Sequence, residues 1–180
     1  MKTTQASLIC VAVLVLPAGC GKHEPPIDPC PSHNSTTTLP PATQCGANTF
    51  GCLVNGKVWV PEKVNSHPHT KKLHADWHDG TFVVYGSKVV DDQYVGLVWL
   101  RVEDSLATEG TYALNNWTPG LGRFEDTLCS YQTDTSWGGQ LTITKFDRSN
   151  YIISGTFEFT VVATGCDTIQ ITEGRFDVTE

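Results

Sequence analysis

The sequence predicts an all-β protein, a single antiparallel β-sandwich or small β-barrel of about 7–9 strands that follows a disordered N-terminal stalk. Three observations indicate this fold class. After Cys45 the chain consists of short apolar runs separated by Gly, Asp and Asn. These runs are rich in β-branched and aromatic residues, which favour strands. No segment shows a convincing apolar repeat of 3.6 residues, the pattern of an amphipathic helix.

Length and charge limit the classes of function. The chain has 180 residues, which is enough for one domain. It carries 12 Lys and Arg against 19 Asp and Glu, a net charge of −7. Because nucleic acids are bound through clustered basic residues, we expect no nucleic-acid partner. Seven Cys, ten Pro and a single Met also argue against a helical bundle or coiled coil.

Residues 1–19 have the layout of a secretory signal peptide. Lys2 precedes an apolar stretch from Leu8 to Leu16, which is too short to span a bilayer. The next residues resemble a bacterial lipobox, and the resemblance implies that Cys20 receives diacylglycerol and becomes the mature N-terminus. Gly21 follows Cys20 where an inner-membrane lipoprotein would carry Asp, so we expect an outer-membrane lipid anchor. The residues that carry the resemblance are Leu16-Pro17-Ala18-Gly19-Cys20. Whether the protein faces the periplasm or the cell surface stays open.

A tether is expected between residues 20 and 44. This stretch contains six prolines and the polar tract Ser35 to Thr38, so it has few apolar side chains to bury. The β-domain is expected to occupy residues 45–180.

The strongest strand signal is the alternation from Tyr151 to Ala163, which predicts a half-buried antiparallel strand. The strand before it, Leu141 to Phe146, is joined to it by a hairpin loop at residues 147–150. In the last strand the buried parity changes between Ile171 and Phe176, and a β-bulge near Glu173 and Gly174 would restore one buried face. The remaining strands are expected, in order, at Leu53–Val60, Thr81–Val90, Gln93–Glu103 and Gly110–Asn115, with a turn at Asp91-Asp92, while Thr118–Leu128 is ambiguous.

Removing Cys10 with the signal peptide and Cys20 by lipidation leaves five cysteines, an odd number. An envelope location permits disulfides. The expected hairpin geometry favours a disulfide between Cys129 and Cys166. Cys45 is left to pair with Cys52 or with Cys30, and spacing does not decide between them.

Four histidines lie within one polar segment that extends from Ser66 to Asp79. Imidazoles and carboxylates are ligands of Zn²⁺ and Cu²⁺, so this segment is a candidate metal site. Lys71 and Lys72 oppose a cation there, and Pro68 and Gly80 favour a solvated loop. The candidate metal ligands are His67, His69, His74 and His78; otherwise no cofactor is expected.

Five tryptophans are many for a domain of this size. Trp59 and Trp99 lie in expected strands and are interpreted as core residues. The others lie among polar residues, where an exposed indole can bind a sugar ring or another apolar ligand. The candidate ligand-binding residues are Trp77, Asn116, Trp117 and Trp137.

The segments Ser154 to Phe159 and Glu173 to Val178 resemble the C-terminal signature of a family of Bacteroidetes envelope lipoproteins. The segment from Asn48 to Trp59 looks like the entry strand of the same family. The resemblance implies a secreted, lipid-anchored β-domain, and it brings no catalytic residues.

These features together favour a non-enzymatic binding module on the outer membrane. Its expected partners are the membrane, through the lipid anchor, and a glycan, a small ligand or an envelope protein. The alternatives are a structural or assembly accessory of the envelope and, third, a metal-binding protein that uses the segment from His67 to Asp79. No hydrolase motif is present, and the adjacent acidic pairs fit solvated turns, so we expect no catalytic residues.

Overall fold

The computed structural model describes residues 30–103, 108–115 and 119–180. Within these ranges the chain is all-β, as expected, and it contains no helix that is long and apolar enough to cross a bilayer. Twelve strands are present: β1 (Thr49–Val54), β2 (Lys57–Trp59), β3 (Glu62–Val64), β4 (Leu73–His78), β5 (Thr81–Val90), β6 (Gln93–Glu103), β7 (Gly110–Leu114), β8 (Gly120–Asp126), β9 (Ser130–Gln132), β10 (Gly139–Asp147), β11 (Ile152–Val161) and β12 (Ile169–Thr179).

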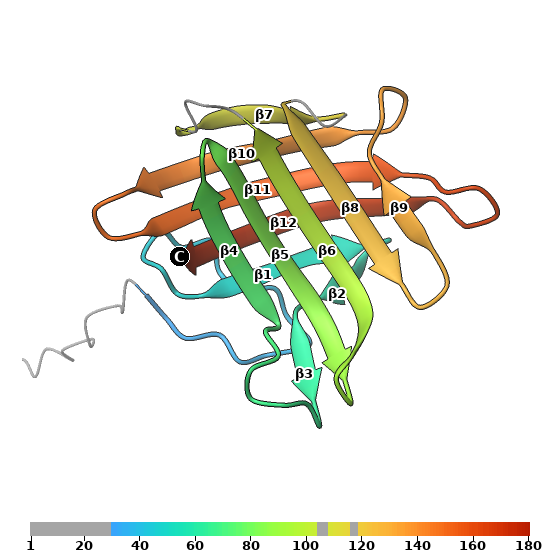
Figure 1. Ribbon diagram of the computed structural model, residues 1–180, viewed down its shortest axis with the longest axis horizontal. Coiled ribbons are helices and arrows are strands. Elements are labelled where there is room, and N and C mark those ends of the chain that lie inside the picture. The colour runs from blue at the N-terminus through green and yellow to red at the C-terminus, as the bar shows by residue number, and fades with distance from the viewer. Residues whose placement is uncertain (1–29, 104–107, 116–118) are drawn as a thin grey trace, which may run out of the picture.

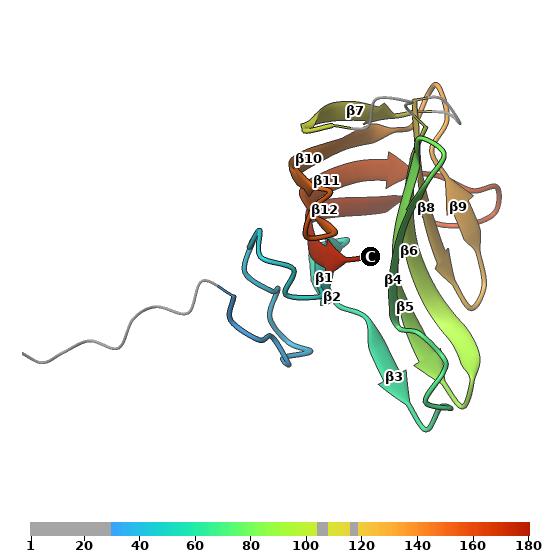
Figure 2. The same ribbon diagram turned by 60° about the vertical axis from the view of Figure 1, so that its left-hand side comes forward.

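All twelve strands belong to one sheet, which curls into a half-barrel (Figure 1). The order is β2-β1-β12-β11-β10-β7-β8-β6-β5-β3, with β4 paired to β5 and β9 paired to β8. Strands β2, β1, β12, β11, β10 and β7 form a back layer, and the others form a front layer (Figure 2). Strand pairing connects the two layers at one place, where Leu114 of β7 pairs with Gly120 of β8 in parallel orientation. The fold therefore combines the two expected architectures, because one sheet folds over itself without closing.

The core lies between the two layers. Alternate residues of each strand point inward, and they include Leu100 of the front layer and Leu141 of the back layer, both fully buried. Phe82 of β5 packs against Phe176 of β12 with ring centroids 5.8 Å apart. Apolar contact between the layers therefore stabilises the half-barrel.

The number of strands exceeds the expected 7–9 because several short strands were not recognised. The segment Leu53–Val60 is two strands, since Asn55 and Gly56 both have positive φ (48° and 77°) and form the turn of a hairpin. The segment 66–79 is not wholly a loop, because β4 pairs with β5 along its full length. The ambiguous region 118–128 contains β8.

The predicted β-bulge in the last strand is confirmed. Phe157 pairs with Gly174 and Phe159 pairs with Ile171, so β12 contains one extra residue at this point. Glu173 has a φ of 50° there. As a result Ile171 and Phe176 both face the core, at 1% and 2% exposure.

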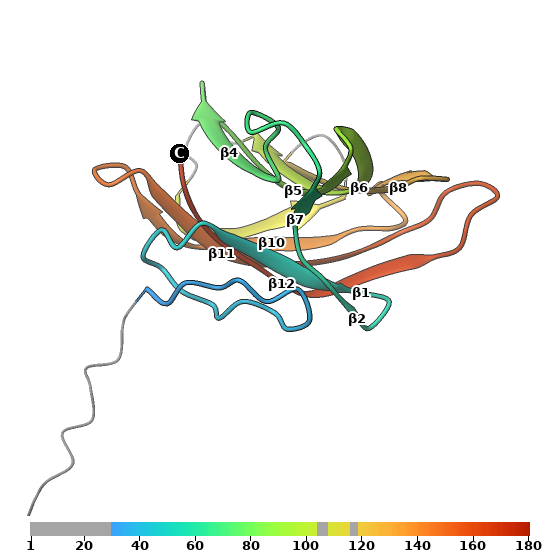
Figure 3. The ribbon, with the colours of Figure 1, turned by 90° about the horizontal axis from the view of Figure 1, so that it is seen from below.

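Residues 30–48 lie against the outer side of the back layer (Figure 3). Pro40 is buried, and a Cβ atom built on Gly51 would lie 2.7 Å from Pro40 Cδ. A disulfide joins Cys30 to Cys45, which selects one of the two pairings left open for Cys45. Residues 30–44, which the sequence assigns to the tether, are thus held against the sheet.

A second disulfide joins Cys129 to Cys166, the pair favoured by the sequence. Cys129 lies in the turn between β8 and β9, and Cys166 lies in the loop between β11 and β12, so this bond connects the front layer to the back layer. Cys52 is a free cysteine and is completely buried in the core.

Candidate functional site

The outer face of the front layer presents aromatic side chains to solvent, and Figure 1 looks onto this layer. In β6 the inward positions hold Val98 and Leu100, both completely buried, so Leu97 and Trp99 must point outward. In β5 the inward Val84 leaves Tyr85 on the outer face in the same way. Tyr85, Leu97 and Trp99 are each partly exposed.

Strand register aligns five of the outward residues in one row. Tyr85 pairs with His74 on one side and with Trp99 on the other. Trp99 pairs with Arg123, and Arg123 pairs with Gln132. Directly paired residues point to the same face, so this transverse row crosses β4, β5, β6, β8 and β9. Four steps between strands, each about 4.8 Å, give the row a length of roughly 19 Å.

A groove of about 280 Å³ lies on this face and is lined by Tyr85, Tyr94, Leu97, Trp99 and Glu125. We call these five residues the aromatic groove. Tyr94, at the start of β6, is 57% exposed. The groove is supported by the rigid centre of the sheet, because β5 and β6 are paired along their lengths. Two tyrosines and one tryptophan in a groove of this kind are typical of a ligand-binding surface.

The charged residues beside the aromatic groove are paired with one another. Arg123 forms an ion pair with Glu125, and Arg101 forms one with Glu103. All four side chains are partly exposed, so these pairs contribute little to stability. The pairs matter more for the choice of ligand, because a carboxylate balances the positive charge of each guanidinium.

The polar ends of the aromatic rings remain available. The described part of the chain offers no hydrogen-bond partner to the hydroxyl groups of Tyr85 and Tyr94 or to Nε1 of Trp99. Burial raises the pKa of Tyr85 above its usual value, and the neighbouring Tyr94 adds to the shift, so the phenol is neutral at physiological pH. The groove therefore combines apolar ring faces with hydrogen-bonding groups at their edges.

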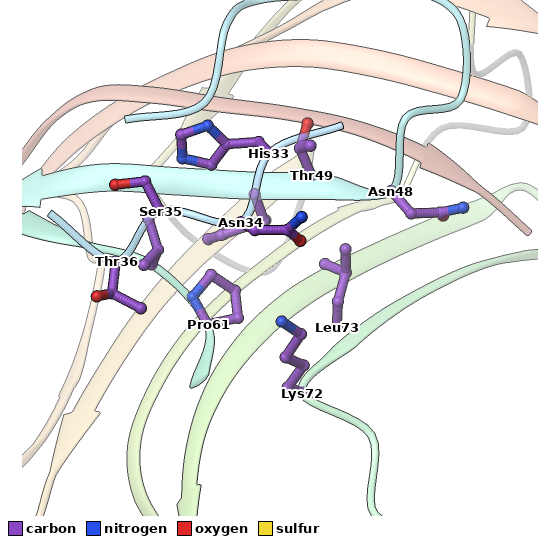
Figure 4. A pocket seen from close by; sticks show the side chains of 11 residues that line it. His33, Asn34, Ser35, Thr36, Asn48, Thr49, Pro61, Lys72 and Leu73 are labelled. Atoms are coloured by element: carbon purple, nitrogen blue, oxygen red, sulfur yellow. The ribbon is translucent and has the colours of Figure 1, made fainter. Parts of the chain in front are cut away.

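Two other hollows are less suited to an external ligand. One is a cavity of about 100 Å³ between residues 33–36 and the starts of β1 and β4, with Asn34, Pro61 and Lys72 among its lining residues (Figure 4). At about 30 Å³ per molecule it has room for about three waters. The other, about 360 Å³, lies on the back layer. Several of its side chains are already bonded, such as Gln140 Nε2 to Glu158 Oε1 at 2.9 Å.

Lys63 and Asp92, which flank the histidine-rich segment on neighbouring strand ends, organise its first half. The Lys63 ammonium donates hydrogen bonds to the carbonyl oxygens of His67, Pro68 and Thr70 at 2.9, 3.3 and 3.1 Å. Asp92 Oδ1 accepts hydrogen bonds from the His67 amide and the Thr70 hydroxyl. A lysine therefore supplies the cation around which this loop folds, and His67, Pro68 and His69 of the loop are exposed.

The structure does not bring the four candidate metal ligands together. His74 and His78 share one face of β4, but four residues of extended strand separate them by about 13 Å. His67 Nε2 lies 3.8 Å from Asp92 Oδ2, and His69 is exposed. Among the described residues, the one cluster with metal-ligand geometry is Cys30, Cys45 and Asp177. Its two sulfurs form a disulfide and its carboxylate accepts several hydrogen bonds, so these atoms are already occupied.

The candidate ligand-binding tryptophans do not form one site. Trp77 points inward from β4 and packs edge-on against Phe146, and the Arg148 guanidinium lies 4.4 Å from its ring centroid. The pocket beside it measures only about 80 Å³. Trp137 is 45% exposed, on the loop before β10. Asn116, Trp117 and the lipidation residue Cys20 lie outside the described residues.

Comparison with known protein families shows the family to which the chain belongs. A family model described as "Domain of unknown function (DUF6252)" matches residues 62–178. The chain belongs to the DUF6252 family. The match extends from β3 to β12, so it includes the aromatic groove and the C-terminal signature but not the segment Asn48 to Trp59. No curated protein and no solved structure matches the chain.

Sequence reasoning missed the aromatic groove of this DUF6252 domain because it interpreted Trp99 as a core residue. The signal was present in the alternation of β6, since Trp99 has the same parity as Arg101 and Glu103, which need contact with water. Trp59 is in the core as expected, at 7% exposure. The face of the strand on which a tryptophan lies therefore predicts its burial better than the fact that it lies in a strand.

Proposed function

We propose that this DUF6252 domain is a non-enzymatic binding module, held at the outer membrane by a lipid on Cys20, that binds its ligand in the aromatic groove. The observation that carries the proposal is the pairing of Tyr85 with Trp99 on an exposed sheet face. Neighbouring strands here leave two large aromatic side chains partly exposed side by side, and exposed apolar surface of this kind marks binding sites.

The position of the N-terminal segment supports an anchored role. Residues 30–48 lie on the outer side of the back layer, whereas the aromatic groove lies on the outer side of the front layer (Figures 2 and 3). The core separates the two surfaces. Cys30, the described residue that is nearest to Cys20 in the sequence, thus lies on the side opposite to the groove, which favours an anchored domain whose groove is open to a ligand.

The groove's chemistry supports binding without catalysis. Glycoside hydrolysis, for example, uses two carboxyl groups on opposite sides of the bond that breaks. Among the residues that line the groove, Glu125 supplies one carboxylate, and Arg123 holds that carboxylate in an ion pair. One carboxyl group in the groove does not supply the pair that this reaction uses.

Hydroxyl-radical labelling of the full chain, with labelled residues identified by mass spectrometry, tests the proposal. The probes are three fractions of Gram-negative envelopes: soluble polysaccharide, detergent-extracted protein and phospholipid vesicles. We expect one fraction to reduce labelling of Tyr85, Tyr94 and Trp99 and to leave the exposed Trp137 unchanged. If all three fractions leave the labelling of the groove unchanged, the groove is not the binding surface.

A further inference from the structure

We propose that the ligand of the aromatic groove is a neutral oligosaccharide that lies along β6, with one sugar ring on Tyr85 and Trp99. This inference rests on the proposed function and adds the chemical class of the ligand. A sugar ring has apolar C–H faces and hydroxyl groups around its edge. The groove has the complementary arrangement, since its aromatic faces are bordered by the polar ends of Tyr85, Tyr94 and Trp99.

The paired charges favour a neutral ligand. An anionic ligand would need an unbalanced cation, but Arg123 and Arg101 are paired with Glu125 and Glu103. Breaking either pair to bind an anion would leave a carboxylate without its partner. Hydroxyl groups, in contrast, can accept from the guanidinium groups and donate to the carboxylates while both ion pairs persist.

A fully apolar ligand fits the groove poorly. It would cover the hydroxyl groups of Tyr85 and Tyr94 without giving them hydrogen-bond partners, and each polar group that is buried without a partner weakens binding. A peptide that binds by adding a strand would need a free sheet edge. The groove instead lies over β5 and β6, and both edges of β6 are paired, to β5 and β8.

The groove sets the direction and minimum length of the ligand. Tyr94, Leu97 and Trp99 follow one another along β6, and Tyr85 and Glu125 lie beside this strand on β5 and β8. Five residues of extended strand from Tyr94 to Trp99 span roughly 17 Å, which exceeds the size of one sugar ring. Longer oligosaccharides should therefore bind more tightly than monosaccharides.

Isothermal titration of the full chain with neutral hexasaccharides of glucose, mannose, xylose and N-acetylglucosamine tests this inference. We expect at least one of them to bind, and its affinity to change less than twofold between low and high salt, because no charge is neutralised. Trp99→Ala should weaken binding at least about 10-fold, and Tyr85→Phe, which removes only the hydroxyl, about 3- to 10-fold. The matched control is Trp137→Ala, which removes an exposed indole elsewhere and should leave affinity unchanged.

Thermal unfolding of each variant identifies losses of binding that come from misfolding. If Trp99→Ala does not fold, Tyr94→Ala replaces it, because Tyr94 is 57% exposed and its loss should not disturb the core. Equal loss of affinity in Trp137→Ala and Trp99→Ala would overturn the inference. The inference would also be overturned if the anionic probe hexagalacturonate binds at low salt and this binding disappears at high salt.

The outcomes separate the two proposals. If no neutral hexasaccharide binds while the protein or vesicle fraction protects the groove from labelling, the ligand class is wrong and the binding role stands. If none binds and no fraction protects the groove, both proposals fail.

Discussion

The Ser154 hydroxyl donates a hydrogen bond of 2.7 Å to Asp177 Oδ1, and both side chains are buried on the outer side of the back layer. The same carboxylate accepts hydrogen bonds from the backbone amides of Cys45, Gly46 and Ala47 at 2.8–3.1 Å and from the Thr43 hydroxyl at 2.6 Å. One buried carboxylate thus holds the N-terminal segment on β11 and β12.

This carboxylate predicts a loss of stability in acid. Burial acts to raise the pKa of Asp177, but hydrogen bonds from Thr43, Ser154 and the Cys45 and Ala47 amides outweigh it, so the pKa is lower than usual. The ionised form therefore stabilises the fold above the unfolded-state pKa of about 4, and this contribution disappears as the pH falls through the lower, folded-state pKa. Asp177→Asn should cost about 1–3 kcal/mol at pH 7 and weaken the pH dependence of unfolding below pH 4. Urea unfolding at several pH values measures both, and Asp79→Asn, on an exposed turn, should leave the profile unchanged.

Cysteine reactivity should follow the disulfide pattern. With intact disulfides and Cys20 lipidated, Cys52 is the one free thiol among the described residues. Burial raises the pKa of Cys52 far above its usual value, and the side chain is completely inaccessible. Iodoacetamide should therefore modify Cys52 only after unfolding, which intact mass and peptide mapping can measure. Modification of Cys129 or Cys166 in the unreduced, unfolded protein would contradict the disulfide between them.

Glycine at residue 155 should be required for packing between the strands. A Cβ atom there would lie 2.5 Å from the Thr142 carbonyl oxygen and 2.7 Å from Phe176 Cζ. Gly155→Ala should therefore destabilise the protein by about 1–3 kcal/mol through overpacking. Gly96→Ala is the matched control, because its Cβ would have no neighbour closer than 3.6 Å. Equal melting temperatures for the two variants would contradict the close contact at Gly155.

Membrane attachment should depend on Cys20. Cys20→Ser removes the thiol that accepts lipid, so the variant should appear in the soluble fraction after cell lysis and fractionation. A globomycin-treated culture provides a second control, because blocking the lipoprotein signal peptidase should retain the residues of the signal peptide on the wild-type protein. Continued membrane association of Cys20→Ser would refute the lipid anchor.

Metal binding by the histidines should be weak. His74 and His78 point from β4 at positions about 13 Å apart, too far to share one ion. The double variant His74→Ala, His78→Ala should therefore bind zinc with the same affinity as the wild type, as measured by titration. A large loss of zinc affinity would show that the two imidazoles meet in another conformation.

The sequence by itself determined the all-β class, the limits of β5 and β6, the β-bulge near Glu173 and the cysteine pair Cys129 and Cys166. These features follow from alternation and turn chemistry along neighbouring residues, which the sequence records directly. The short strands were harder to recognise, because in β4 the polar His74, Asp76 and His78 mask the inward alternation of Leu73, Ala75 and Trp77.

Only the tertiary structure decided where the candidate site lies. Alternation places Trp99 on the same face of β6 as Arg101, but it does not show which strands pair or in which register. The row from His74 to Gln132 unites residues of five strands, and the layer that these strands form turns its outer face away from the N-terminal segment. Hydrogen bonds between strands and apolar contact between layers set that arrangement. Both join residues that are far apart in the chain, so no local pattern in the sequence specifies them.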